Sequence, residues 1–185
     1  EEALIYIREA LSGNNQGFKG EYYQLEKFPV DPATLSEIPI IIGGGGKVKT
    51  PTLAGKYSEE FNIYAGPKET LQNSISLFKS VASENGRDEK TLEITTACPP
   101  VVGLTKESVD NSLISAAKAL IQPEDEIAKN WQDRSYLYGT PEDVVKTLSM
   151  WQEVGIEAVY LQLLDLEQSK RDESVEVIQK AINLL

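Results

Sequence analysis

Segments with helical spacing alternate with short β-branched segments along almost the whole chain, and this alternation constrains the fold more than any other feature. It predicts an α/β fold with a parallel sheet whose strands are joined by right-handed helical crossovers. An α/β barrel and an open doubly wound sheet both satisfy this pattern. The expected helices span 1–12, 49–57, 67–85, 105–120, 140–155 and 175–185, and the expected strands span 38–42, 61–64, 92–97 and 158–163.

The strand at 38–42 has the sequence Ile-Pro-Ile-Ile-Ile and lacks any alternation of apolar and polar residues. Such a run is typical of a parallel strand buried on both faces, and it stops abruptly at Gly43. About four strands are too few for a closed barrel of eight, which usually takes roughly 250 residues. Since the chain has 185 residues, we expect half of such a barrel to be missing.

A run of glycines follows this strand and precedes the start of a helix. Free backbone N–H groups and the helix dipole favour an anion at such a turn, and nearby lysines and a threonine hydroxyl add to that preference. The spacing does not fit a nucleotide-triphosphate loop. The alternative is a flexible turn that only connects strand and helix. The candidate phosphate-binding residues are Gly43, Gly44, Gly45, Gly46, Lys47 and Thr50.

The formal net charge of -11 argues against a nucleic-acid partner, because such proteins normally carry a basic face. Apolar runs are too short for a membrane span of about 20 residues. The chain contains no histidine, which excludes a Ser-His-Asp triad or a histidine-ligated metal within it. The single cysteine, Cys98, is expected to be a small buried side chain and fits a reducing cytoplasm.

Other polar and aromatic residues are expected to be structural. The acid pairs at 59–60 and 125–126 stand in polar runs, which favours a solvated surface over paired catalytic carboxylates. Trp151, Tyr22, Tyr23 and Tyr160 are expected to fill the core or the packing between helices and sheet, in preference to stacking on a cofactor. The polar stretch 122–134 is expected to be a loop with a short helix. No catalytic residue and no metal ligand is assigned.

Three motifs together resemble the luciferase-like monooxygenase family, and most closely its branch that uses the deazaflavin coenzyme F420. The first is the strand 38–42 with its four glycines, a lysine-threonine helix start and Leu-Ala-Gly-Lys-Tyr at 53–57 before Phe61-Asn62. The second is an aromatic hairpin at 18–25, and the third is Gly-Thr-Pro-Glu-Asp at 139–143 with Gly155-Ile156. The resemblance covers only the carboxy-terminal half of a family member, strands five to eight.

This resemblance implies that residues 1–185 are the second half of a TIM barrel whose amino-terminal half is absent. The parent would be an oxidoreductase or monooxygenase that uses F420, with FMN as the alternative, to transfer hydride to or from a small organic substrate. The glycine turn would hold the cofactor phosphate, and the fragment alone would be inactive. The family usually has aspartate-glycine where Glu59-Glu60 stands, which leaves the role of Asn62 open.

Two other interpretations remain open at this stage. A half barrel exposes two sheet edges, so the chain could be a non-catalytic assembly module that forms a homodimer or pairs with the missing amino-terminal half. An open doubly wound nucleotide-binding domain is favoured only by the alternation of helices and strands.

Overall fold

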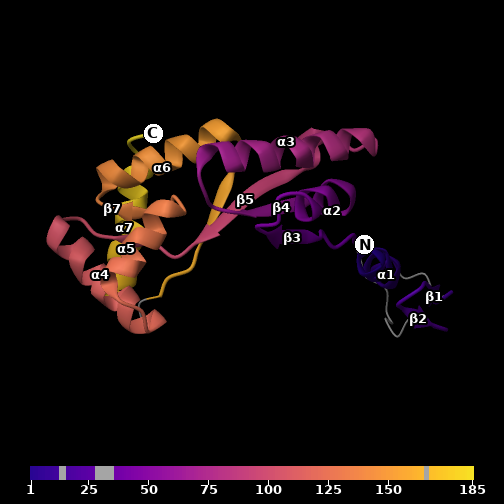
Figure 1. Cartoon of the computed structure of the whole chain (residues 1–185), viewed down its shortest axis with the longest axis horizontal. Coiled ribbons are helices and arrows are strands. Elements are labelled where there is room, and N and C mark those ends of the chain that lie inside the picture. Colours follow the sequence, from indigo (N-terminus) through magenta and orange to yellow (C-terminus); the bar gives the residue numbers. More distant parts are fainter. Residues whose placement is uncertain (13–15, 28–35, 165–166) are drawn as a thin grey trace.

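The computed structural model describes residues 1–12, 16–27, 36–164 and 167–185 (Figure 1). It contains seven α-helices in these ranges: α1 (Glu2–Leu11), α2 (Lys49–Tyr57), α3 (Lys68–Glu84), α4 (Lys106–Leu120), α5 (Glu124–Asp133), α6 (Pro141–Val154) and α7 (Gln168–Ile182). The strands are β1 (Phe18–Lys19), β2 (Gln24–Leu25), β3 (Ile41–Gly44), β4 (Glu60–Tyr64), β5 (Glu93–Cys98), β6 (Val101–Val102), β7 (Tyr138–Gly139) and β8 (Ala158–Leu161), with a 3-10 turn, η1, at Glu89–Thr91.

Four strands form one parallel sheet in the order β3-β4-β5-β8. This confirms the predicted α/β class and its parallel sheet. Each strand lies beside the preceding strand of the same sheet, without the reversal of order that defines a doubly wound sheet. Because all four strands run in one direction, their carboxyl ends meet at one edge of the sheet.

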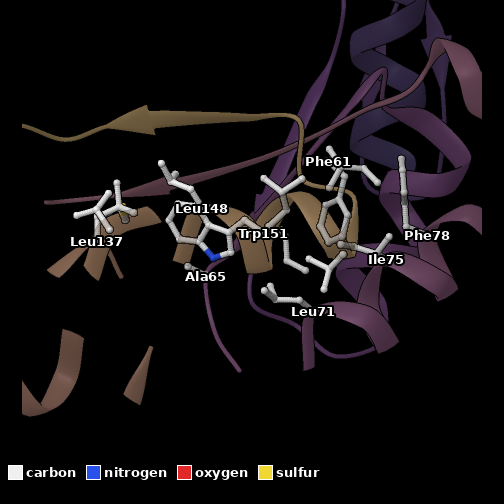
Figure 2. Close-up of a cluster of buried hydrophobic side chains, with 14 of the residues drawn as sticks. Phe61, Ala65, Leu71, Ile75, Phe78, Leu137, Leu148 and Trp151 are labelled. Atoms are coloured by element: carbon white, nitrogen blue, oxygen red, sulfur yellow. The ribbon is translucent and has the colours of Figure 1, made fainter. Parts of the chain in front are cut away.

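One face of this sheet is packed against helices. Phe61 and Ile63 of β4 point into a core completed by α3 and α6, where Phe78 and Trp151 are buried (Figure 2). The rings of Phe61 and Phe78 lie 5.2 Å apart between centroids. Burying such large aromatic side chains supplies much of the hydrophobic stabilisation of the sheet, and the predicted core position of Trp151 is confirmed.

The opposite face has no helix layer in the described structure, and we call it the open face. Register partners lie on the same side of a parallel sheet, so the register assigns its residues. They are Ile41, Gly43, Glu60, Asn62, Tyr64, Glu93, Thr95, Ala97, Ala158 and Tyr160.

The open face corrects two sequence-based expectations. The strand at 38–42 is not buried on both faces, since Ile41 is 54% exposed and Ile38 also faces solvent. The strand instead spans Ile41–Gly44, so two of the glycines belong to it. Tyr160 is 49% exposed and does not fill the core, because it lies on the open face. Tyr22 and Tyr23 are exposed as well and do not fill the core.

Smaller sheets flank the main one. The aromatic segment near 20–25 is a hairpin in which β1 and β2 pair antiparallel around the turn at 20–23. After β5 the prolines interrupt the ladder as predicted, and β6 pairs with β7 in a separate parallel pair. The stretch 122–134 contains the ten-residue helix α5, which is longer than its polar sequence suggested.

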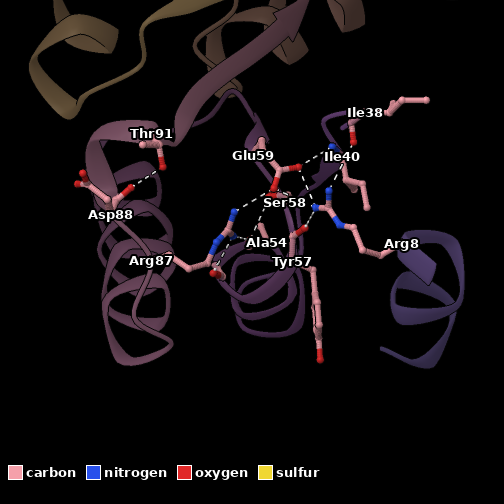
Figure 3. A network of polar contacts seen from close by, with 11 residues as sticks. Arg8, Ile38, Ile40, Ala54, Tyr57, Ser58, Glu59, Arg87, Asp88 and Thr91 are labelled. Atoms are coloured by element: carbon pink, nitrogen blue, oxygen red, sulfur yellow. Dashed lines mark hydrogen bonds and ion pairs between the residues drawn. The ribbon is translucent and has the colours of Figure 1, made fainter. Parts of the chain in front are cut away.

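Glu59 joins separate parts of the chain at the amino-terminal end of β4 (Figure 3). Its carboxylate accepts hydrogen bonds from Arg8 of α1 at 2.9 Å, from Arg87 at 3.2 Å and from the Ile40 amide at 2.8 Å. Burial alone raises the pKa of Glu59, but the Ile40 amide and the two guanidinium groups outweigh it, so the pKa is lowered. The prediction that the 59–60 pair is solvated surface is therefore wrong, because cations distant in sequence converge on it.

We predict that Glu59→Gln lowers the free energy of unfolding at pH 7 by about 1 kcal/mol, since solvent still screens this carboxylate. A folded-state pKa below the unfolded value of about 4.3 stabilises the fold above that pH, and the contribution is lost as pH falls through the folded value. The gap between wild type and Glu59→Gln should therefore shrink between pH 7 and pH 3. Urea unfolding at both pH values measures it.

The exposed Glu157 provides the matched control for this experiment. Glu157→Gln makes the same change in charge and should alter the free energy of unfolding little at either pH. An equal effect of both substitutions would show that the Glu59 network does not stabilise the fold.

Candidate functional site

The glycine run lies at the carboxyl edge of the parallel sheet, where α/β proteins form their binding sites. Gly44 ends β3 with a φ of +148°, a conformation that residues other than glycine rarely adopt. The chain then turns into α2, whose first turn has no side-chain cap. Amide N–H groups of such a helix start are free to bind an external anion.

Close packing explains why glycines occupy this turn. A Cβ added at Gly46 would lie 2.5 Å from Oγ1 of Thr50, and one added at Gly45 would lie 2.9 Å from the ring of Tyr64. Both distances are shorter than a real contact allows, so a larger residue would displace Thr50 or Tyr64. The backbone of the turn is thus held against a hydroxyl on one side and an aromatic ring on the other.

A cavity of about 190 Å³ opens beside this turn. The turn after β3 forms one wall, and the turn after β4 with the start of α3 forms another, including Gly66, Pro67 and Thr70. Helix α3 also begins without a side-chain cap, so the start of α3 and the side chain of Thr70 border this volume, whereas no residue of α2, Thr50 included, lines it. Asp133 and Arg134, at the end of α5, complete the lining. Asp133 is ion-paired with Lys129, whereas Arg134 forms no ion pair with another described residue.

The structure brings together some of the predicted phosphate-binding residues. Gly44, Gly45 and Gly46 line the cavity, and Thr50 packs against the last of them. Gly43 lies inside β3 opposite Asn62, so it is a strand residue and does not line the cavity. Lys47 is exposed, does not line the cavity and forms no ion pair with the described part of the chain.

Sequence reasoning missed Arg134 and Tyr64. Arg134 stands in a polar run without a motif, so nothing in the sequence indicates that α5 ends beside the glycine turn. Tyr64 is 57% exposed at the carboxyl end of β4, on the open face. Only the register reveals that Tyr64, Ala97 and Tyr160 form one row across the sheet.

A larger cavity of about 690 Å³ lies on the other side of the α5 terminus. Trp131, Tyr136 and Tyr138 supply its aromatic lining, and Asp110 and Lys106 of α4 contribute charges. Burial and the nearby Asp110 raise the pKa of Tyr138. Opposite charges and several rings give this cavity no single ligand preference.

Two residues that could have carried chemistry are structural. Burial raises the pKa of Cys98 to about 11, which keeps the thiol protonated near neutral pH and confirms the expected inert, buried side chain. Asn62 donates a hydrogen bond to Thr95 at 2.8 Å, which uses its amide within the sheet.

No helix in the described ranges is long and apolar enough to cross a membrane.

Comparison with known proteins identifies relatives of this fold. The family model described as luciferase-like monooxygenase matches residues 1–158. No curated protein matches the chain by sequence.

Solved structures that share the fold include the following three. An F420-dependent secondary alcohol dehydrogenase in complex with an F420-acetone adduct matches 97% of this chain and 60% of its own, at 23% identity and a TM-score of 0.75. The coenzyme F420-dependent tetrahydromethanopterin reductase of Methanopyrus kandleri matches 99% and 62%, at 16% identity and a TM-score of 0.72. The oxygenating constituent of 3,6-diketocamphane monooxygenase from Pseudomonas putida, in complex with FMN, matches 98% and 61%, at 14% identity and a TM-score of 0.66. The chain therefore spans about 60% of the length of these proteins.

We predict that Gly46→Ala weakens the binding of inorganic phosphate about tenfold, because the added methyl group displaces Thr50 and several charge-assisted hydrogen bonds depend on the turn. Calorimetric titration of the intact protein with phosphate measures this loss. Gly86→Ala is the control, since an added Cβ at Gly86 meets nothing within 4 Å, although Gly86, unlike Gly46, has a positive φ of +70°. If Gly86→Ala weakens phosphate binding equally, a general loss of stability explains the effect and the turn is not the site.

Proposed function

Since the chain belongs to the luciferase-like monooxygenase family, we propose that it is the carboxy-terminal half of the (β/α)8 barrel of a flavin- or deazaflavin-dependent oxidoreductase. The parent protein would transfer hydride to or from a small organic substrate. This half would supply the binding of the cofactor phosphate, and would be inactive alone. F420 is the preferred cofactor and FMN the alternative.

The sheet supports the barrel. Its four strands follow one another in chain order, as successive strands of a barrel do, and β3 and β8 end the sheet as unpaired edges. An exposed edge strand presents unpaired N–H and C=O groups that need a partner. In an eight-stranded barrel the other four strands would pair with these two edges and cover the open face. The relatives are longer by an amount that fits four further strand-helix units.

The glycine turn and its cavity are the single observation that carries the cofactor assignment. Gly44, Gly45 and Gly46 would bind the phosphate through the backbone, and Thr50 would hold the turn in shape. Lys47, exposed at the rim, would add long-range attraction in a chain of net charge -11. Arg134 also lines this cavity, with its guanidinium carbon 6.0 Å from the centroid of the Tyr136 ring, and would offer a second positive charge.

The bound cofactor itself supplies the hydride chemistry. The residues of this chain would orient it by fixing its phosphate at one edge of the sheet and by offering an aromatic surface beside it. Tyr64 packs against Gly45 and stands on the open face, so a planar ring system anchored at the turn would lie against it. Asp133, which lines the cavity, is held in an ion pair with Lys129, and we assign no catalytic residue here.

We predict that the intact protein binds both F420 and FMN more tightly than riboflavin, which has the same ring as FMN but no phosphate. Lys47→Gln should reduce the affinity for F420 and FMN about threefold, as expected for an exposed cation, and leave riboflavin binding unchanged. Fluorescence titration measures all three ligands.

Lys90→Gln removes the same charge at the opposite edge of the sheet, beside the start of β5, and is the control. Failure of both F420 and FMN to bind, or the same affinity in wild type and Lys47→Gln, would contradict the phosphate-turn assignment. Equal losses in the two lysine variants would reduce the role of Lys47 to net charge alone.

A further inference from the structure

A buried carboxylate lies on the open face, away from the phosphate cavity. Glu60, the first residue of β4, is only 7% exposed. The hydroxyl of Thr95 donates to its Oε1 at 2.5 Å, and the hydroxyl of Tyr160 donates to its Oε2 at 3.2 Å. Asn62 donates to the same Thr95 hydroxyl, which orients the Thr95 proton toward Glu60. The three strands β4, β5 and β8 thus converge on one acid.

Both of these partners of Glu60 are neutral hydroxyl groups. Glu60 forms no ion pair with any residue within the described ranges. The open face contains a second acid, Glu93, and no lysine or arginine stands at any position of that face. The face is therefore negatively charged where it is most polar, and otherwise carries exposed apolar and aromatic groups such as Ile41 and Tyr64.

Covering this face would remove the remaining water from Glu60. Taking a carboxylate out of water costs several kcal/mol unless a cation and further hydrogen bonds replace the solvent. Two hydroxyl donors satisfy part of the hydrogen-bonding capacity of the carboxylate but none of its charge. A covering surface that brings a positive charge to Glu60 would offset this cost.

A second copy of the same face cannot supply this charge. Two copies stacked through their open faces would bring the Glu60 and Glu93 carboxylates of both into one interface, with no cation from either face. Like charges placed opposite one another across an interface are destabilising. The charge pattern thus disfavours the homodimer considered from the sequence and favours a partner surface of different composition.

We propose that the amino-terminal half of the barrel covers the open face and directs a lysine or arginine side chain from one of its strands onto Glu60. This rests on the proposed half barrel, but not on the identity of the cofactor. The partner surface is apolar opposite Ile41 and Tyr64 and basic opposite Glu60.

A charge exchange in the intact polypeptide tests this. Glu60→Lys should raise the unfolding equilibrium constant roughly 30-fold or more, because it sets two cations against each other in a buried position. Replacing one particular lysine or arginine of the amino-terminal half by glutamate should restore most of that loss. Glu157→Lys, which reverses an exposed charge off the open face, should cost little and gain nothing from the same replacement.

If Glu60→Lys does not fold, the milder Glu60→Gln tests the same contact through double-mutant cycles. Glu60→Gln is combined in turn with a Met replacement of each lysine and arginine of the amino-terminal half. One of these pairs should show a coupling of at least tenfold in the unfolding equilibrium constant. Coupling below twofold with every one of them would overturn the proposal. If F420 or FMN still binds when every coupling is below twofold, the proposed function stands and only this inference is overturned. If one pair shows the expected tenfold coupling but neither cofactor binds, only the proposed function is refuted.

Discussion

The parallel register of β3, β4, β5 and β8 is the constraint on which the rest of the structure depends. It brings the ends of all four strands to one edge, so the turns after β3 and β4 share a cavity although about 20 residues of chain separate them. It also sorts side chains between a face packed on α3 and α6 and a face left open. The cavity and the open face are thus two consequences of one hydrogen-bonded ladder.

Much of this sheet could be predicted from the sequence, because periodicity reports local geometry. The helices α3 and α6 and the strands β4 and β5 lie close to their predicted positions, since caps and breakers such as Thr140 and Gly155 mark the ends of α6. The glycine turn could be found for the same reason. Its place at the carboxyl edge follows from the strand direction, which alternation with helices already implied.

The errors arose where a residue's environment is set by distant parts of the chain. Glu59 and Glu60 are adjacent acids in a polar run, yet one is bound by Arg8 and Arg87 and the other is buried against Thr95 and Tyr160. Adjacent residues of a strand point to opposite sides, so the two acids enter different environments. No local sequence pattern shows which partner groups each environment contains. The prediction that the apolar run at 38–42 is buried on both faces is wrong for a related reason. The run suits such burial, but only one face of the sheet is covered in the described structure.

That mismatch is itself informative. The apolar sequence of this strand suits burial on two faces. Ile41 nevertheless lies open to solvent, so nothing in the described chain buries the second face of the strand. Tyr64 and Tyr160 on the same face are exposed in the same way. The edge strands β3 and β8 also leave backbone groups without a neighbouring strand in the described sheet. Apolar, aromatic and backbone features would all be satisfied by one covering layer of strands. Glu60 lies in the first row of that face, so the same layer would cover its carboxylate, and a cation opposite Glu60 would be the most selective contact of such an interface.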